Sequence, residues 1–277
     1  MDFKKIQIIF LVIFVMIDLF LFSLFRQNAN LQTENSNKGS DAEIIKQMQN
    51  DQITVSPKLS TSGETGYYLS AVNDDSLNTT KSKLKNQKTT YSNHILRSTF
   101  KRPIGLYSGN YHEILDKLMK KDTFIAHGSS YEYNSDLSTK TSVVYSQKIS
   151  DGGTMYGPRH GEIIFDVSSD HLLVGYTQSY MNDVSVLREK TDIISPAKAL
   201  VWLYQYNEIP DNSKIKWVNM YYTQLLSIKN NVVLIPTWVI GYTSSGSSSM
   251  TIKRINAFNG AILDGEGTTE AATSNDN

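Results

Sequence analysis

The chain has 277 residues, with 27 basic and 27 acidic side chains, so its formal net charge is zero. This balance excludes the basic excess of nucleic-acid-binding proteins and provides no acidic excess for binding cations. No cysteine is present, which excludes disulfides and lipid attachment at a processed cysteine. The residues after the first 25 are numerous enough for one large domain or two small ones.

The first feature along the chain is the apolar segment IIFLVIFVMIDLFLFSLF, residues 8–25. Its length as a helix is about 27 Å, and a bilayer core is roughly 30 Å thick. With Ile6 and Gln7 included, residues 6–25 are long enough to span. No Ala-x-Ala cleavage pattern follows in RQNANLQTENSNK, so the segment predicts an uncleaved signal anchor rather than a removed signal peptide.

The orientation of this anchor follows from its flanking cations. Lys4 and Lys5 precede the segment, and a single cation, Arg26, follows it. The positive-inside rule then places residues 1–5 in the cytoplasm and the chain after about residue 27 outside. We therefore expect a single-pass protein of the cell membrane with an extracellular C-terminal region.

Asp18 lies near the middle of the apolar segment, where a carboxyl group is costly in hydrocarbon. Two interpretations are open: a tolerated neutral carboxyl group, or a contact with a transmembrane helix of a partner. We expect the second. Helical spacing places large apolar residues on the face of Asp18. The predicted contact site comprises Asp18, Leu11, Phe14, Val15, Leu21 and Phe22, and Phe25 shares their face.

After the anchor, the order of strand-like and helix-like segments is typical of an α+β fold with mostly antiparallel sheets. Residues 26–40 predict a polar tether, and residues 265–277 predict a disordered tail. Two small lobes are expected between them, at residues 41–134 and 135–264. Helices are predicted within residues 40–51, 110–122 and 194–210. Strands are predicted within residues 52–59, 66–72, 91–100, 140–149, 160–169, 171–180, 214–226, 232–243 and 250–258.

A search for catalytic chemistry finds none. The five histidines, at positions 94, 112, 127, 160 and 171, lack the spacing of metal ligands. No nucleophile elbow, Walker loop or dinucleotide fingerprint occurs. We therefore expect no catalytic residue, no metal, no cofactor and no enzymatic activity. In the loop DGGTMYGPRHG, the glycines favour backbone geometry, and a binding role for Arg159 or His160 stays open.

Aromatic residues in two predicted strands have two interpretations, a position in the core or a position that binds a ligand. Trp238, in PTWVIGY, fits a strand core better than a ligand-stacking position. Pro236 indicates an edge position or a bulge, because proline has no N–H to donate. Tyr221 and Tyr222 point to opposite faces of their strand, so we expect one to be buried and the other exposed.

The N-terminal stretch MDFKKIQIIFLVIFVMIDLFL is the first of several segments whose order is informative. The others are VVYSQKI, GYTQSY, ISPAKALVWLYQYNEIP, MYYTQLL, LIPTWVI and RINAFNG. In this order they resemble the YycI family of low-GC Gram-positive bacteria, up to about Gly260. Two positions depart from the family pattern: Met220 replaces a common glycine, and Arg254–Ile255 precedes Asn-Ala where the family tends to have a tyrosine.

The resemblance implies a membrane-anchored accessory protein with a YycH-like α+β extracytoplasmic region. Its implied partners are a YycH-like protein and the sensor histidine kinase WalK (YycG), which controls cell-wall metabolism. It implies no catalytic residue. A binding module for peptide or cell-wall fragments is the alternative. A cell-wall hydrolase is a third possibility, but spacing alone pairs none of Glu132, Asp136 and Glu162.

Overall fold

The computed structural model describes residues 3–33, 38–73, 75–106, 111–150, 152–157, 159–247 and 249–263. The chain divides into two compact units, Met1–Gln47 and Met48–Asn277. The first unit contains helix α1 (Phe3–Thr33), and α2 (Lys38–Asn50) crosses the boundary between the units. The predicted tail, residues 265–277, lies outside the described residues.

Helix α1 includes the predicted anchor, residues 6–25, and continues through Arg26–Thr33. The first part of the predicted tether is therefore helical, because it contains neither proline nor glycine and extends a helix that has already nucleated. The large apolar side chains described between Ile8 and Phe22 are 45 to 65% exposed. Among the helices of the described residues, none combines the length and the apolar character that a membrane span requires.

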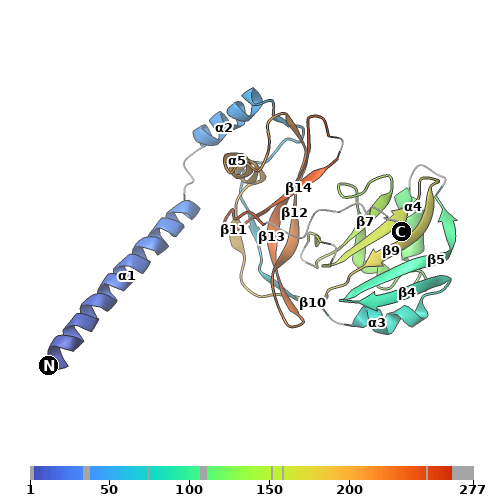
Figure 1. Ribbon diagram of the computed structural model, residues 1–277, viewed down its shortest axis with the longest axis horizontal. Helices are drawn as coiled ribbons and strands as arrows, with labels where there is room; N and C mark the ends of the chain where they lie inside the picture. Colours follow the sequence, from blue (N-terminus) through green and yellow to red (C-terminus); the bar gives the residue numbers. More distant parts are fainter. Residues whose placement is uncertain are drawn as a thin grey trace, which may run out of the picture. The chain divides into compact units, whose positions relative to one another are not determined.

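The second unit contains two six-stranded sheets and one two-stranded sheet (Figure 1). Among the described strands, every pairing is antiparallel except that of β1 with β12, which confirms an α+β fold with mostly antiparallel sheets. Sheet A has the order β1 (Thr54–Val55), β12 (Ser213–Ile228), β13 (Asn231–Ser244), β3 (Leu69–Val72), β10 (Asn182–Val186), and β14 (Thr251–Asn256) pairs with β13. Sheet C has the order β4 (Gln87–Ser92), β5 (Ile95–Gly105), β9 (Leu172–Gln178), β8 (Glu162–Val167), β7 (Ser142–Gln147), β6 (Tyr131–Asn134). The small sheet pairs β2 (Glu64–Gly66) with β11 (Thr191–Ile193).

Strand pairing does not follow the predicted lobes. In sheet A, β3 pairs with β13, and in sheet C, β5 pairs with β9. Each sheet thus combines strands from before and after residue 134, so the boundary between residues 134 and 135 does not separate the sheets. Local periodicity identifies a strand but carries no information about a partner 67 or more residues away in the sequence.

A second difference concerns residues 91–100, which were predicted as one strand. The structure turns at Asn93–His94, so that this stretch is shared between β4 and β5. Asn93 and His94 have φ values of 50° and 61°. Two consecutive left-handed residues form the turn that matches the twist of a two-residue hairpin.

The predicted helices are confirmed near residues 110–122 and 194–210, where α4 (Tyr111–Met119) and α5 (Pro196–Gln205) form. Ser195 accepts a hydrogen bond from the backbone N–H of Lys198 at 3.2 Å, and Pro196 occupies the first helical position. Such an N-terminal cap stabilises the first turn of a helix. Short helical turns form α3 (Ser76–Thr80), Lys81–Lys83 and Gly128–Ser130.

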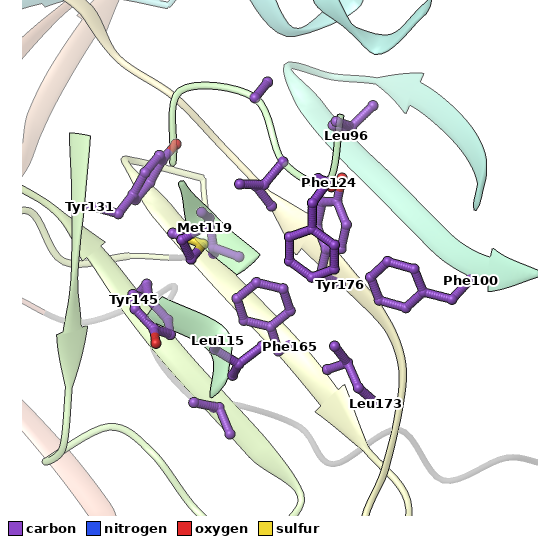
Figure 2. Packing of buried hydrophobic residues seen from close by; sticks show 14 of the residues in the cluster. Leu96, Phe100, Leu115, Met119, Phe124, Tyr131, Tyr145, Phe165, Leu173 and Tyr176 are labelled. Atoms are coloured by element: carbon purple, nitrogen blue, oxygen red, sulfur yellow. Dashed lines mark hydrogen bonds between the residues drawn. The ribbon is translucent and has the colours of Figure 1, made fainter. Parts of the chain in front are cut away.

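The core of sheet C packs beneath α4 (Figure 2). Phe165 on β8 lies 5.5 Å from the ring of Tyr176 on β9 and 5.8 Å from that of Tyr145 on β7. Leu115 and Met119 contribute from α4, and both are buried. The apolar face of this helix therefore covers one face of the sheet.

A short segment, Thr154–Tyr156, connects the two large sheets, and we call it the strap. Met155 N–H donates to the carbonyl of Gln147 at the end of β7, at 2.9 Å. On the other side, Tyr156 N–H donates to the carbonyl of Tyr222 at 3.0 Å, and Tyr222 N–H donates to Thr154 at 2.8 Å. The strap thus extends sheet A at the edge of β12 while it remains bonded to sheet C.

The strap explains why one prediction about the paired tyrosines is wrong. Tyr221 and Tyr222 are both buried, each 4% exposed. They do point to opposite faces: Tyr221 packs with Tyr156, and Tyr222 packs with Met155. Side chains of the strap therefore cover both faces of β12 here, and neither face is left to solvent.

Trp238 and Pro236 lie in β13 as their chemistry suggests. Trp238 is 4% exposed and its indole N–H donates to the carbonyl of Ile194 at 2.8 Å, which confirms a core position. Pro236 falls between the stretch paired with β3, residues 231–234, and the stretch paired with β14, residues 237–242. The missing N–H is therefore at a local edge of the strand.

Gly161→Ala should destabilise the second unit by about 2–4 kcal/mol. Gly161 has a φ of 78°, and an added Cβ would lie 2.7 Å from Met155 Sδ and 2.9 Å from Gln147 Cβ. Urea unfolding of the full-length chain, followed by tryptophan fluorescence, measures the loss, because all three tryptophans lie in the second unit.

The matched control is Gly152→Ala in the same loop. Gly152 has a φ of 95° with no atom within 4 Å of an added Cβ. Only the backbone strain remains there, which should cost about 1–2 kcal/mol. Equal losses in the two variants would contradict the conclusion that close packing against the strap requires Gly161.

Candidate functional site

All six residues of the predicted transmembrane contact site lie on α1. Leu11 and Phe14 are 65% and 62% exposed, and Asp18 is exposed among them. The other members are Val15 at 49%, Leu21 at 55% and Phe22 at 56% exposure. Helical geometry places them on one face, so α1 presents an apolar surface around one carboxyl group. Contact of this surface with a partner helix stays a prediction.

The histidines of the second unit pack mainly against aromatic rings. His127 stacks on Tyr180 with ring centroids 4.2 Å apart, and His112 stacks on Tyr133 at 4.8 Å. His171 contacts the hydroxyl group of Tyr111. Within the described ranges, no three His, Asp or Glu side chains form a group that could hold a metal ion.

The three carboxylates considered for hydrolysis have different surroundings. Glu132 and Asp136 line a cavity of about 150 Å³, and Asp136 accepts a hydrogen bond from Asn219 at 2.6 Å. Glu162 does not line this cavity. A cavity of this size is below the roughly 300–1,000 Å³ typical of small-molecule sites.

Glu162 is the most unusual ionisable group of the second unit. Its side chain is 4% exposed, and its Oε1 accepts a hydrogen bond from the N–H of Gly157 at 2.8 Å. Burial raises its pKa to about 7, although the hydrogen bond from Gly157 acts in the opposite direction. At neutral pH this carboxyl group therefore exists in both protonation states.

Two phenol groups lie near Glu162. The rings of Tyr156 and Tyr221 are 5.7 Å apart, between the sheets. Burial raises the pKa of Tyr221 to about 12 and also raises that of Tyr156, with a further contribution from the charge of Glu162 on both. Arg254 lowers the pKa of Tyr156. The junction of the sheets is thus a polar cluster enclosed by apolar packing.

Sequence reasoning did not find this cluster. In β8, Ile163, Phe165 and Val167 are buried in the sheet C core, so strand periodicity assigns Glu162 to the opposite face. That face would be exposed in an isolated sheet. The loop that contains the strap covers it, and no local pattern predicts such a cover.

Arg159 and His160 lie in the same loop as the strap. His160 N–H donates to the carbonyl of Gly157 at 2.8 Å, which forms a tight turn. Gly157 and Gly161 have φ values of 130° and 78°, so these glycines serve backbone geometry, as their type suggested. Arg159 is exposed and His160 is half-buried. A binding role for either side chain stays an open alternative.

Glu162→Gln should change how stability depends on pH. The folded-state pKa of about 7 exceeds the ordinary 4.5, so the folded protein binds this proton more tightly than the unfolded chain. The resulting stability is fully present below pH 4.5 and is lost as the pH rises through 7. Glutamine keeps an acceptor for Gly157 without titrating. The variant should match the wild type near pH 4 and exceed it by up to about 3 kcal/mol near pH 8.

Urea unfolding across this pH range measures the difference. Glu132→Gln, which changes an exposed carboxylate on β6, is the control and should leave the pH profile unchanged. A Glu162→Gln variant whose stability stayed parallel to the wild type at all pH values would show that Glu162 titrates normally.

Comparison with solved structures finds distant similarities, among them two chains. An uncharacterized protein from Eubacterium rectale ATCC 33656 is 11% identical, with a TM-score of 0.46 over 78% of this chain and 91% of that chain. The C-terminal domain of YpeB from Bacillus megaterium is 10% identical, with a TM-score of 0.35 over 82% of this chain and 95% of that chain. Both TM-scores are below 0.5, so neither similarity bears on function.

No curated protein matches the sequence. A family model does match, over residues 31–258, and its description is YycI protein. This range covers most of the chain, including every described strand, α4, α5 and the strap. The chain therefore belongs to the YycI family.

Proposed function

We propose that the chain is a membrane-anchored accessory regulator of the sensor histidine kinase WalK (YycG) and acts together with a YycH-like protein. The observation that carries the proposal is the family match over residues 31–258. Membership of the YycI family suggests an accessory role in the YycG two-component system. The anchor, the named partners and the control of cell-wall metabolism are parts of the proposal.

The exposed apolar surface of α1 supports anchoring. A run of large apolar side chains that remains 45 to 65% exposed is unfavourable in water. Burial in lipid or against another apolar helix would remove that cost. With Lys4 and Lys5 on the N-terminal side, the proposed orientation leaves the N-terminus in the cytoplasm and the second unit outside.

Asp18 supports a regulatory contact within the membrane. A carboxyl group in hydrocarbon is stabilised when another helix offers a hydrogen-bond partner. In the proposed mechanism, α1 pairs with a transmembrane helix of WalK or of the YycH-like protein through the face that contains Asp18. The state of the kinase then depends on whether this contact is made.

Protease added to intact protoplasts should digest the second unit and spare a cytoplasmic marker protein. The expectation follows from the proposed orientation, in which every residue after about position 27 is extracellular. Immunodetection of a C-terminal epitope measures the digestion. Full protection of the epitope in intact protoplasts, with digestion only after lysis, would place the second unit inside the cell.

Asp18→Leu should weaken association with at least one partner by roughly two- to thirty-fold. This range corresponds to losing an interhelical hydrogen bond of about 0.5–2 kcal/mol. Membrane insertion should be kept, because leucine is more apolar than aspartate. Crosslinking in membranes at matched expression, with WalK and with the YycH-like protein, measures the association.

Ser23→Leu is the matched control for this substitution. It also replaces a polar residue of the same segment by leucine, but five residues from Asp18 and so on a different face of α1. Ser23→Leu should leave association unchanged. If Asp18→Leu pairs with both partners as well as the wild type, the contact does not involve the face that contains Asp18.

A further inference from the structure

The second unit has a cavity of about 450 Å³ where the two large sheets meet. One wall comes from the end of β7 and the residues after it, Gln147–Ser150, together with Ser130. The facing wall is Tyr180–Val184, which leads from β9 into β10. The volume lies within the range of roughly 300–1,000 Å³ that is typical of small-molecule sites.

Hydrogen bonds hold the two walls in place. The side chain of Gln147 donates to the carbonyl of Met181 at 2.6 Å and accepts from its N–H at 2.9 Å. Gln147 and Met181 are 3% and 1% exposed. Because this pair spans from sheet C to the segment before β10, the cavity is formed by tertiary structure rather than by one flexible loop.

The cavity is lined by two opposite charges. Lys148 lies on one wall and Asp183 on the other, and both are exposed. Within the part of the chain that the structure describes, neither forms an ion pair. Asp183 has a left-handed backbone with a φ of 48°, where the pairing of β10 with β3 shifts register between Asn182 and Ser185. Such a bulge takes a residue out of the regular ladder.

The remaining lining favours a polar ligand. Ser130, Ser150, Tyr180 and Asn182 also line the cavity, and their side chains carry hydroxyl or amide groups. A simple anion would be attracted by Lys148 but repelled by Asp183. A simple cation would be attracted by Asp183 but repelled by Lys148. A ligand that has both an anionic and a cationic group satisfies both walls through charge-assisted hydrogen bonds.

We propose that this cavity binds a short peptide with free termini. Lys148 Nζ receives the terminal carboxylate, Asp183 receives the terminal ammonium group, and the hydroxyl and amide side chains bind the peptide groups between them. The proposal goes beyond the regulatory role and does not depend on it. It gives the second unit a defined site for the peptide binding that the sequence left as an alternative function.

Isothermal titration calorimetry on the full-length chain in detergent tests the site, with tri-alanine as the probe. We expect tri-alanine with free termini to bind. N-acetylation of the peptide removes the charge that Asp183 receives, and C-amidation removes the charge that Lys148 receives. Each modification should weaken binding roughly tenfold or more.

Two variants assign each charge to its terminus. Lys148→Gln should weaken binding of tri-alanine. The same variant should bind the C-amidated peptide as well as the wild type binds that peptide. Asp183→Asn should also weaken binding of tri-alanine, and it should bind the N-acetylated peptide as well as the wild type binds that peptide. Asparagine tolerates the left-handed conformation at this position, so the fold is kept. Lys120→Gln, an exposed lysine outside the cavity, is the control and should bind as the wild type does.

The outcomes of these peptide titrations are independent of the outcomes of the kinase-association experiments. No binding up to about 10 mM tri-alanine, or equal binding by the wild type and both cavity variants, overturns the proposal. The proposal is also overturned if each variant loses the same affinity for all three forms of the peptide, because each charged side chain would then not bind one particular terminus. Kinase association depends on α1 and would be measured independently of these titrations.

Discussion

The backbone hydrogen bonds of the strap, Thr154–Tyr156, connect the two large sheets of the second unit. A peptide segment that donates to sheet C, and both donates to and accepts from sheet A, satisfies polar groups that would otherwise lie at two sheet edges. It also places Met155, which is fully buried, into the packing around Tyr222. Without the strap, each sheet would expose a face that is now covered.

Several properties of the second unit depend on this connection. Glu162 is buried because the loop containing the strap covers the outer face of β8, and its raised pKa follows from that burial. Gly161 must be glycine because the strap packs directly against it. The cavity begins where the chain leaves β7 toward the strap, at Lys148, and Asp183 also lines it.

The two units obtain stability in different ways. The second unit buries its large apolar side chains, and residues such as Phe165 and Leu234 are fully enclosed. In contrast, α1 exposes apolar side chains such as Leu11 and Phe20 by more than half of their surface. The hydrophobic effect favours removing such surface from water, and burial of α1 in an apolar environment is part of the proposed function.

The sequence by itself determined the local elements and the family. The cap at Ser195 and Pro196, the apolar face of α4 and the core position of Trp238 follow from propensity and periodicity, which act over a few residues. Five of the quoted segments lie within residues 31–258, where the family model matches, and a sixth, RINAFNG, begins there, so their order was sufficient to identify the family. The face of α1 around Asp18 also follows from helical spacing alone.

Only the tertiary structure decided which strands pair, which tyrosines are buried and where charges meet. β5 and β9 are distant in sequence, and strand periodicity is the same for any partner. Tyr221 has the pattern of a residue on one sheet face, but a second sheet and the strap cover both faces. Lys148 and Asp183 are 35 positions apart and line one cavity because Gln147, at the end of β7, is hydrogen-bonded to Met181, which precedes β10. Local patterns report burial on one face of one element, whereas these features arise from contacts between elements.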